Sequence, residues 1–314
     1  MKLIKIATRG APHDYQSSLL PIVIQSMGYQ IDWVDHDQAD LLILGPFFKK
    51  NQKSFRWLPK PLRPLASKSL NTISPKRKQD PLKLFHTQEN ERHDFVNADY
   101  SISFDLGVQS NNHMRFPYWM EMLDWSHEGI LGNTNPRYGQ LLGISTLMSP
   151  LGDQYLKRGE TCALLSSHLR EPRGSLFKAL EKVIQIQGFG AFFNKEIKNH
   201  HSSGFLKVDI LKDFSFNLCP ENGLYPGYYT EKIPEAFYSG CLPITWADNN
   251  IGVDFNPSAF LNLEPLFKSN FQELPDLFRN KEKLEAYQSQ SLLQKKPSIE
   301  PLKDYLKVIL SDLS

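Results

Sequence analysis

Short apolar runs that alternate with helical patterns constrain the fold of this chain more than any other feature. In the first half, four such runs predict strands, at residues 2–7, 39–45, 82–87 and 99–105. Between them, residues 16–28 predict an amphipathic helix that ends at Gly28, and residues 115–126 predict an aromatic helix. Strands that alternate with helices are typical of a parallel sheet with crossover connections.

A second series of the same kind begins near Cys162. Its predicted strands are 161–167, 214–219 and 242–246, and its predicted helices are 174–185 and 231–239, the latter stopped by Gly240. Residues 300–313 predict a last amphipathic helix. The expected fold class is therefore α/β, with two Rossmann-like domains facing a cleft.

A length of 314 residues accommodates two domains with sizeable cores. Hydrophobic residues make up 40% and charged residues 22%, a composition typical of globular proteins. We expect an N-terminal domain over 1–158, a C-terminal domain over 159–295, and a C-terminal helix within 296–314.

Residues 49–83 form a basic, proline-rich insert. They hold eleven Lys or Arg, a single acid and five prolines, so their net charge is +10 while the whole chain carries only +2. Proline disfavours regular structure, which predicts a long loop. The loop is either a solvated excursion or a basic patch that faces an anionic acceptor or membrane surface. Nucleic acid is disfavoured as a partner, because no recognition helix accompanies the charge.

The predicted location is the cytoplasm. If residues 49–83 are a basic patch that faces a membrane, peripheral contact at the inner membrane face is also expected. No apolar run reaches the ~18 residues that a membrane span needs. The first residues predict a buried strand rather than a secretory leader. Three widely spaced cysteines lack metal-ligand spacing and are typical of a reduced protein.

Polar residues at the end of strand 214–219 mark the candidate site. Glu221 and Asn222 follow this strand, and ligands of parallel sheets bind beyond the carboxyl ends of strands. Thr230 is the expected N-cap of the next helix, and Lys232 adds a cation to its first turn. Helix N-termini attract phosphate, whereas Glu231 would repel it and is better suited to sugar hydroxyls. The stretch thus predicts a nucleotide-sugar site.

An ordered set of motifs resembles the α-1,3/4-fucosyltransferases of glycosyltransferase family ten. The motifs are Pro220-Glu221-Asn222, Tyr228-Tyr229-Thr230-Glu231-Lys232, Pro243-Ile244-Thr245-Trp246 and Pro257-Ser258-Ala259-Phe260. Weaker matches lie at 85–105, 112–119 and 166–180, so the resemblance covers roughly residues 80–265. It implies a GT-B architecture, an acceptor-side N-terminal domain and a C-terminal domain that binds the nucleotide sugar.

The resemblance also implies roles for individual residues. Glu89 matches the glutamate proposed as catalytic base, while Arg173 and Lys232 match residues that bind the pyrophosphate. The chain departs from the family pattern at Gln88, where Gly is usual, and at Pro220, where Phe is usual.

Four further residues match the donor-binding loop of the family. Glu231 matches a glutamate bound to the ribose, and Asn222 and Tyr228 match residues that contact the donor near its phosphates. Glu221 belongs to the same loop. After the strand at 242–246, Ala247-Asp248 replaces the usual Gly-Ser.

The implied reaction is an inverting transfer of L-fucose from GDP-fucose to a glycan hydroxyl, in α-1,3 or α-1,4 linkage. One base deprotonates the acceptor, and cations stabilise the departing diphosphate, so no metal or other cofactor is expected beyond a divalent cation that aids release. Neither Asp35-His36-Asp37 nor His168 with His200-His201 predicts a metal site. Two alternatives stay open: a transferase for another nucleotide sugar, and a catalytically degenerate protein that binds a glycan or nucleotide.

Overall fold

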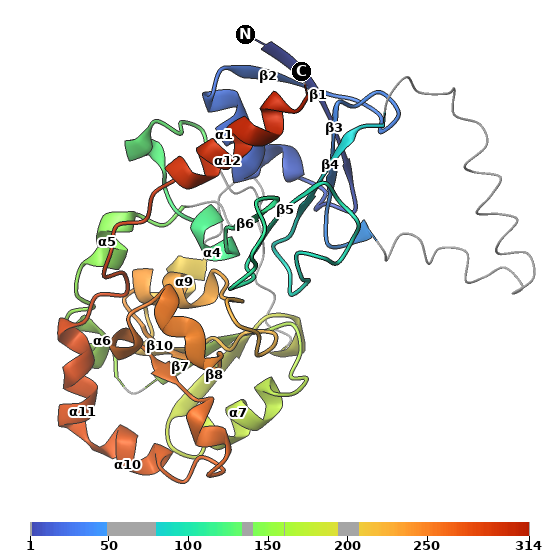
Figure 1. The fold of residues 1–314 in the computed structure, drawn as a ribbon. Coiled ribbons are helices and arrows are strands. Elements are labelled where there is room, and N and C mark those ends of the chain that lie inside the picture. The colour runs from blue at the N-terminus through green and yellow to red at the C-terminus, as the bar shows by residue number, and fades with distance from the viewer. Residues whose placement is uncertain (1, 49–79, 134–140, 160, 194–206, 314) are drawn as a thin grey trace, which may run out of the picture. The chain divides into compact units, whose positions relative to one another are not determined.

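The computed structural model describes residues 2–48, 80–133, 141–159, 161–193 and 207–313. The chain divides into two compact units (Figure 1). The N-terminal unit comprises Met1–Phe116, Glu128–Asn133 and Ile299–Ser314, and the C-terminal unit comprises Pro117–His127 and Thr134–Ser298. Residues 49–79 of the predicted basic insert and both His200 and His201 lie outside the described residues.

The N-terminal unit is built on a six-stranded parallel sheet with the order β2-β1-β3-β4-β5-β6. Its strands are β1 Lys2–Arg9, β2 Tyr29–Trp33, β3 Leu41–Leu44, β4 Leu82–His86, β5 Tyr100–Ser103 and β6 His113–Arg115. Helix α1 Leu19–Ser26 connects β1 to β2. Because β4 begins at Leu82, the last two residues of the range 49–83 belong to the sheet rather than to the insert.

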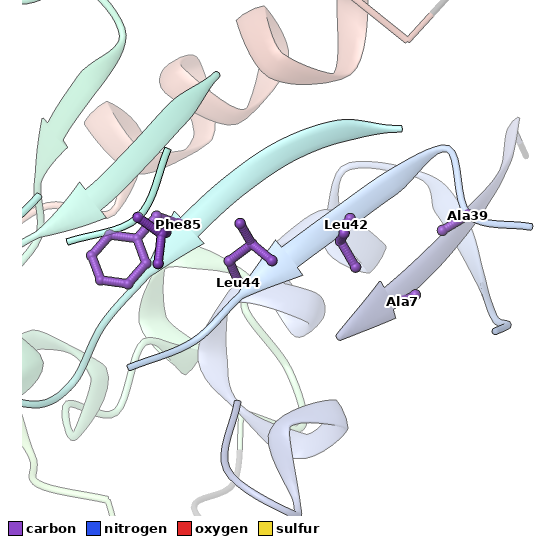
Figure 2. Packing of buried hydrophobic residues seen from close by; sticks show 6 residues of the cluster. Ala7, Ala39, Leu42, Leu44 and Phe85 are labelled. Carbon is purple, nitrogen blue, oxygen red and sulfur yellow. The ribbon is translucent and has the colours of Figure 1, made fainter. Parts of the chain in front are cut away.

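One face of this sheet carries a small apolar cluster (Figure 2). Ala7 of β1 lies opposite Leu42 of β3, and Leu44 of β3 lies opposite Phe85 of β4. Cross-strand neighbours on one face of a sheet contact each other directly, and burying each of the Leu and Phe side chains contributes roughly 1.5–3 kcal/mol relative to leaving it exposed. The cluster therefore fixes the register of the three central strands.

The C-terminal unit holds a five-stranded parallel sheet with the order β11-β10-β9-β7-β8. Its strands are β7 Thr161–Leu165, β8 Gln185–Phe189, β9 Phe216–Leu218, β10 Leu242–Thr245 and β11 Leu261–Asn262. Counted within the unit, this is the order 2-1-3-4-5, which the first five strands of the N-terminal sheet share. Such doubly wound sheets bind ligands where the order reverses, between their first and third strands.

Short helices surround the C-terminal sheet. They are α4 Tyr118–Glu121, α5 Ile144–Met148, α6 Gln154–Lys157, α7 Arg173–Leu180, α8 Lys207–Leu211, α9 Lys232–Tyr238, α10 Leu274–Arg279 and α11 Lys281–Glu285. Helix α9 connects β9 to β10 and ends at Tyr238. Gly240 follows two residues later, and its φ of 75° lies in the left-handed region that glycine favours. The expected βαβ unit with its glycine stop is therefore present.

Helix α12 Glu300–Ser311 completes the N-terminal unit. Its buried face holds Leu302, Leu306, Ile309 and Leu310, and the Tyr305 hydroxyl donates to the Ser101 carbonyl oxygen at 3.2 Å. Contacts such as these place residues 299–314 with the N-terminal unit. In the same way, 117–127 and 134–158 group with the C-terminal unit, so this division differs from the expected boundary at 158/159.

The expected α/β class with two parallel-sheet domains is confirmed. Two expected helices are shorter than the sequence predicts. The aromatic helix at 115–126 reduces to α4, because Arg115 ends strand β6 and Pro117 precedes the helix. Helix α7 ends at Leu180, and Gln185 begins β8 instead of ending a helix.

We find no helix within the described ranges that is both long enough and apolar enough to cross a membrane.

Candidate functional site

Glu221 anchors the carboxyl edge of the C-terminal sheet. It follows β9, its side chain is 0% exposed, and it accepts hydrogen bonds from the Thr230 amide and hydroxyl, both at 2.8 Å. Lys232 Nζ donates to the same carboxylate at 3.0 Å. A buried carboxylate is stable only when it is paired and hydrogen-bonded. Glu221 therefore ties the loop after β9 to the start of α9.

The expected N-cap role of Thr230 is wrong. The residue before α9 is Glu231, which has helical backbone angles and makes no capping hydrogen bond with its side chain. The Thr230 hydroxyl is committed to Glu221 and accepts from Lys232 Nζ at 2.6 Å. Thr230 thus orients a charged pair instead of closing the helix end.

Lys232 remains a cation in this setting. Burial alone favours its neutral amine, but the carboxylates of Glu221 and Glu231 outweigh burial and raise the pKa of Lys232 above its ordinary value. About a fifth of the side chain is exposed. The sheet edge therefore presents a fixed positive charge with a limited opening to solvent.

Glu231 and Glu235 share a third basic residue, Lys207. Lys207 Nζ lies 3.1 Å from Glu231 and 2.8 Å from Glu235, and both carboxylates are buried. Burial opposes ionisation of Glu231, yet the charges of Lys207 and Lys232 outweigh it and lower the pKa of Glu231 to about 2. Burial raises the pKa of Glu235 to about 7, and the neighbouring Glu231 charge adds to this effect.

Lys207 was not found in the sequence analysis. It belongs to no recognised motif, and its partners follow it by 24 and 28 residues. The sequence of α9 does indicate that a basic partner is needed, because Glu231 and Glu235 are four residues apart on an otherwise buried face. Two carboxylates so placed on one helix require a cation from elsewhere.

Arg173, at the start of α7, bridges the loops that follow β7 and β9. Its guanidinium donates to Asn222 Oδ1 at 2.5 Å and to Ser166 Oγ at 3.1 Å, and it lies 3.3 Å from His168 Nε2. Asn222 Nδ2 in turn donates to the Tyr228 hydroxyl at 3.5 Å. Burial lowers the pKa of Arg173, and Glu221 opposes that shift.

The sequence left open a pairing of Arg173 with Glu171 and a competing role for Arg170. Glu171 instead accepts the Ser175 amide at 3.3 Å, and Arg170 is exposed. Of the two arginines, Arg173 is the one that reaches Asn222. The bridging residue is therefore the one that the family resemblance selects.

A small pocket of about 70 Å³ opens among these groups. Arg173, Lys207 and Lys232 contribute cations to its lining, Glu231 and Glu235 contribute carboxylates, and residues of β7 and β9 form its apolar wall. The pocket lies beside the last residues of β7 and β9, the first and third strands of the sheet. This is the position where doubly wound sheets bind their ligands.

All six sequence-predicted donor residues meet at this edge. They are Arg173, Glu221, Asn222, Tyr228, Glu231 and Lys232. Tyr229, their neighbour in sequence, is a core residue whose hydroxyl donates to Asp248 at 2.6 Å.

The seventh predicted residue, Glu89, belongs to the N-terminal unit. It lies in the loop after β4, where its amide donates to Thr87 Oγ1 at 3.1 Å and its carbonyl oxygen accepts from Thr87 Oγ1 at 3.0 Å. The side chain is half-buried, and its carboxylate makes no hydrogen bond or ion pair with any residue that the structure describes. It is a positioned carboxylate whose acceptor oxygens are uncommitted within that part of the chain.

Asp105 tethers the loop that carries Glu89. This buried carboxylate accepts from Arg92 Nε, from the His93 amide at 2.7 Å and from Ser103 Oγ at 2.7 Å. Burial raises the pKa of Asp105, but these hydrogen bonds outweigh it, so the net shift is downward. The loop is therefore fixed at both ends, at Thr87 and at Asp105.

In the described segments, no three His, Cys, Asp or Glu side chains are grouped closely enough to hold a metal ion. Asp35 and His36 are exposed after β2, and His168 contacts Arg173.

Two family models match the chain. Residues 156–290 match the C-terminal model of glycosyltransferase family 10 (fucosyltransferase), and residues 74–122 match the N-terminal domain model of the α-(1,3)-fucosyltransferase FucT. The chain belongs to glycosyltransferase family 10. All six predicted donor residues of this family 10 protein fall inside the first match, and Glu89 falls inside the second.

A curated relative, the α-(1,3)-fucosyltransferase FucT of Helicobacter pylori, is 30% identical over 220 residues, which cover 64% of this chain and 44% of that protein. The family 10 chain described here thus spans less than half of that relative's length.

Solved structures of α1,3-fucosyltransferases have the same fold. One with GDP-fucose gives a TM-score of 0.65 at 19% identity and covers 99% of this chain and 91% of that one. Another gives 0.66 at 22% identity, over 99% and 90%. The expected GT-B type of fold is confirmed.

Proposed function

We propose that this family 10 protein transfers L-fucose from GDP-fucose to a hydroxyl group of a glycan acceptor, with inversion at the anomeric carbon and an α-1,3 or α-1,4 linkage. The observation that carries the proposal is the convergence of Arg173, Glu231 and Lys232 at the switch point of the C-terminal sheet, which is the place between β7 and β9 where the strand order reverses. All three residues lie within the segment that the family model matches. A solved relative with the same fold binds GDP-fucose.

The diphosphate is the part of the donor that suits the cations at this edge. Arg173 and Lys232 supply positive charge that is partly shielded from bulk water, which strengthens their interaction with phosphate. Asn222 and Tyr228 add polar hydrogens beside Arg173. Glu231, held ionised by Lys207, is an acceptor for ribose hydroxyls.

Transfer requires a base and a stabilised leaving group. In the proposed reaction Glu89 takes the proton of the acceptor hydroxyl, and the oxygen of that hydroxyl forms a bond to the anomeric carbon of fucose. The bond from that carbon to the diphosphate oxygen breaks, and GDP leaves with the bonding electrons. Arg173 and Lys232 stabilise the negative charge that develops on GDP. A divalent cation enters only as an aid to product release.

The acceptor is proposed to be an oligosaccharide or a lipid-linked glycan, met in the cytoplasm or at the inner membrane face. The three cysteines are buried free thiols, which suits a reducing compartment. Residues 76–78 of the basic insert are the proposed contact with an anionic surface.

Thermal denaturation with a panel of nucleotides tests the donor. A ligand at 100 times its dissociation constant adds about 2.7 kcal/mol to the free energy of unfolding, so GDP and GDP-fucose should both raise the melting temperature. Equal stabilisation by UDP and UDP-sugars would contradict a guanine nucleotide site and support another donor. Stabilisation by GDP-fucose without GDP release in the presence of glycan acceptors would identify a degenerate binding protein. Loss of transfer in EDTA with rescue by manganese would contradict the metal-free chemistry.

A further inference from the structure

The amino-terminal edge of the C-terminal sheet carries a second concave surface, opposite to the donor edge. A cavity of about 480 Å³ opens there, beside Gly159 before β7, Val183 before β8 and Phe216 at the start of β9. A neighbouring cavity of about 260 Å³ shares Lys182, Val183 and Pro275 with it. Together they form one groove, called here the α7–α10 groove after two of its walls, which are labelled in Figure 1.

Among the residues that the structure describes, the charged side chains that line the groove are all cations. Its charged lining residues are Lys178 and Lys182 on one wall, and Arg279 and Lys281 on the other. Lys281 lies 3.4 Å from Glu285, whereas the side chains of the other three make no hydrogen bond or ion pair with any residue in the described ranges. Three uncompensated charges that converge on one hollow favour an anionic occupant.

The floor of the groove is apolar. Phe216, Leu274, Phe278 and Leu284 line it and are themselves buried. A simple inorganic anion would satisfy the cations but would make no use of this apolar floor. Pockets of 300–1,000 Å³ with an apolar lining and a few convergent polar groups are typical of small-molecule sites.

The far end of the groove is shaped by a strained turn. Asn270 and Phe271, both lining residues, have φ angles of 53° and 62°. A bulky aromatic residue rarely adopts left-handed angles, and such strain persists only where surrounding contacts hold it. Phe271 is held by its contact with Phe267, with ring centroids 5.3 Å apart. The turn thereby gives this end of the groove a fixed apolar wall.

We propose that the α7–α10 groove binds an amphipathic organic phosphate, with its phosphate at Lys182 and Arg279 and its apolar body on the phenylalanine floor. The groove does not overlap the donor pocket, so the proposal is independent of the proposed transferase activity. The same chemistry is found in a free phosphate ester and in the headgroup region of an anionic phospholipid. The two sources differ in whether the apolar part lies in a bilayer.

Titration of the full chain with hexyl phosphate, followed by calorimetry, tests this inference. Burial of the hexyl chain on the floor should make its binding at least about tenfold tighter than that of inorganic phosphate. The double variant Lys182→Ala/Arg279→Ala should weaken hexyl phosphate binding at least about tenfold. Both residues are exposed, so the variant should fold, and an unchanged melting temperature without ligand serves as a check. Lys212→Ala, an exposed lysine of the same unit, is the matched control.

Vesicles distinguish the two sources. Co-sedimentation with phosphatidylcholine vesicles that contain phosphatidic acid, lost in the double variant, would assign the groove to a membrane lipid. Binding of hexyl phosphate without vesicle binding would assign it to a free ester. Equal affinities of wild type and double variant, or inorganic phosphate binding as tightly as hexyl phosphate, would overturn the proposal.

Discussion

The two parallel sheets share the strand order 2-1-3-4-5 but treat the gap between their first and third strands differently. In the C-terminal unit the loops after β7 and β9 are connected by side chains. Arg173 joins Ser166 after β7 to Asn222 after β9, beside a small charged pocket. Side chains can rearrange around a ligand without disturbing the backbone, so this switch point can accept one.

The corresponding place in the N-terminal unit is closed by backbone. The Gly45 amide donates to the Arg9 carbonyl oxygen, and the Phe47 amide donates to the Gly10 carbonyl oxygen, both at 2.9 Å. A Cβ at Gly10 would lie 2.1 Å from the Phe48 nitrogen, and one at Gly45 would lie 2.4 Å from the Gly10 oxygen. No side chain fits between these loops. The N-terminal unit instead offers Glu89, from the next strand along.

The comparison suggests a division of labour. At the edge of the C-terminal sheet, acidic and basic groups are paired, and Glu231 and Lys232 are held in their charged forms, which suits binding of a charged donor. Glu89 lies on a tethered loop, and its carboxylate has no partner within the described residues, which suits a group that must accept a proton. Fixed charge and available acceptor oxygens are different requirements, and the two units meet one each.

Glu89→Gln should have the largest effect. Glutamine keeps the shape of the side chain but does not take a proton, so turnover should fall by on the order of 10²–10⁴. GDP affinity should stay at the wild-type value, because the proposed donor residues belong to the other unit. Initial rates with saturating donor and calorimetric GDP titration measure the two quantities.

Glu91→Gln, two residues along the same loop, is the matched control and should retain activity. Full activity of Glu89→Gln would transfer the role of base to Glu91 or Glu121. A parallel loss of GDP affinity would break the comparison between the units.

Lys232→Met should weaken GDP binding by about 10- to 100-fold, since a charge-assisted hydrogen bond contributes about 1.5–3 kcal/mol. Turnover should fall too, because the same cation stabilises the leaving diphosphate. The melting temperature should decrease, since Glu221 loses its cation while buried. Lys212→Met controls for the loss of one positive charge. Unchanged GDP affinity in Lys232→Met would contradict the proposal that the donor binds at this edge.

The interior strands of both sheets could be predicted from the sequence, and the edge strands could not. Interior parallel strands are covered on both faces, so they are continuous apolar runs such as Leu41–Leu44. The four missed strands are β2, β6, β8 and β11, which are the edges of the two sheets as described. Edge strands are half-exposed, as in Tyr29–Trp33, and their mixed composition resembles that of loops.

The candidate site divides in the same way. Contiguous motif residues such as Glu221, Glu231 and Lys232 were predicted, because local sequence carries both their spacing and the resemblance. Lys207 was missed because its role arises only when α8 packs beside α9. The error on Thr230 has a similar cause. Local sequence favours Thr230 as an N-cap, but the tertiary structure places the buried Glu221 carboxylate beside it, and the Thr230 hydroxyl hydrogen-bonds to that carboxylate instead.

Glu235→Gln should change how stability depends on pH. The pKa of Glu235 is about 7 in the folded protein and 4.5 ordinarily, so the folded state holds a proton that the unfolded state releases between these values. The resulting stabilisation is complete below about pH 4.5 and is lost as the pH rises to about 7. Glutamine removes this loss. The variant should therefore gain on the order of 1–3 kcal/mol relative to wild type between about pH 5 and pH 7.5.

Urea denaturation of both proteins across this range measures the difference, in which the contributions of other groups cancel. Glu282→Gln, an exposed glutamate of the same unit, should follow the wild-type curve. Parallel curves for Glu235→Gln and wild type would mean that Glu235 ionises normally, and burial beside Glu231 would then not control the charges at this edge.

Lys207→Met tests whether the charge network positions Glu231 for the donor or only stabilises the fold. Without Lys207, the Glu231 carboxylate loses a partner 3.1 Å away, so the KM for the donor should rise about 3- to 10-fold while kcat changes little. Lys207→Arg keeps the charge and should restore most of the affinity. Adding Glu235→Gln to Lys207→Met removes the second carboxylate that needed the cation, so stability should recover while the donor KM stays high. Recovery of both together would show that Lys207 acts on the fold alone. A high KM that persists in the stable double variant would establish that Glu231 must be held in place to bind the donor.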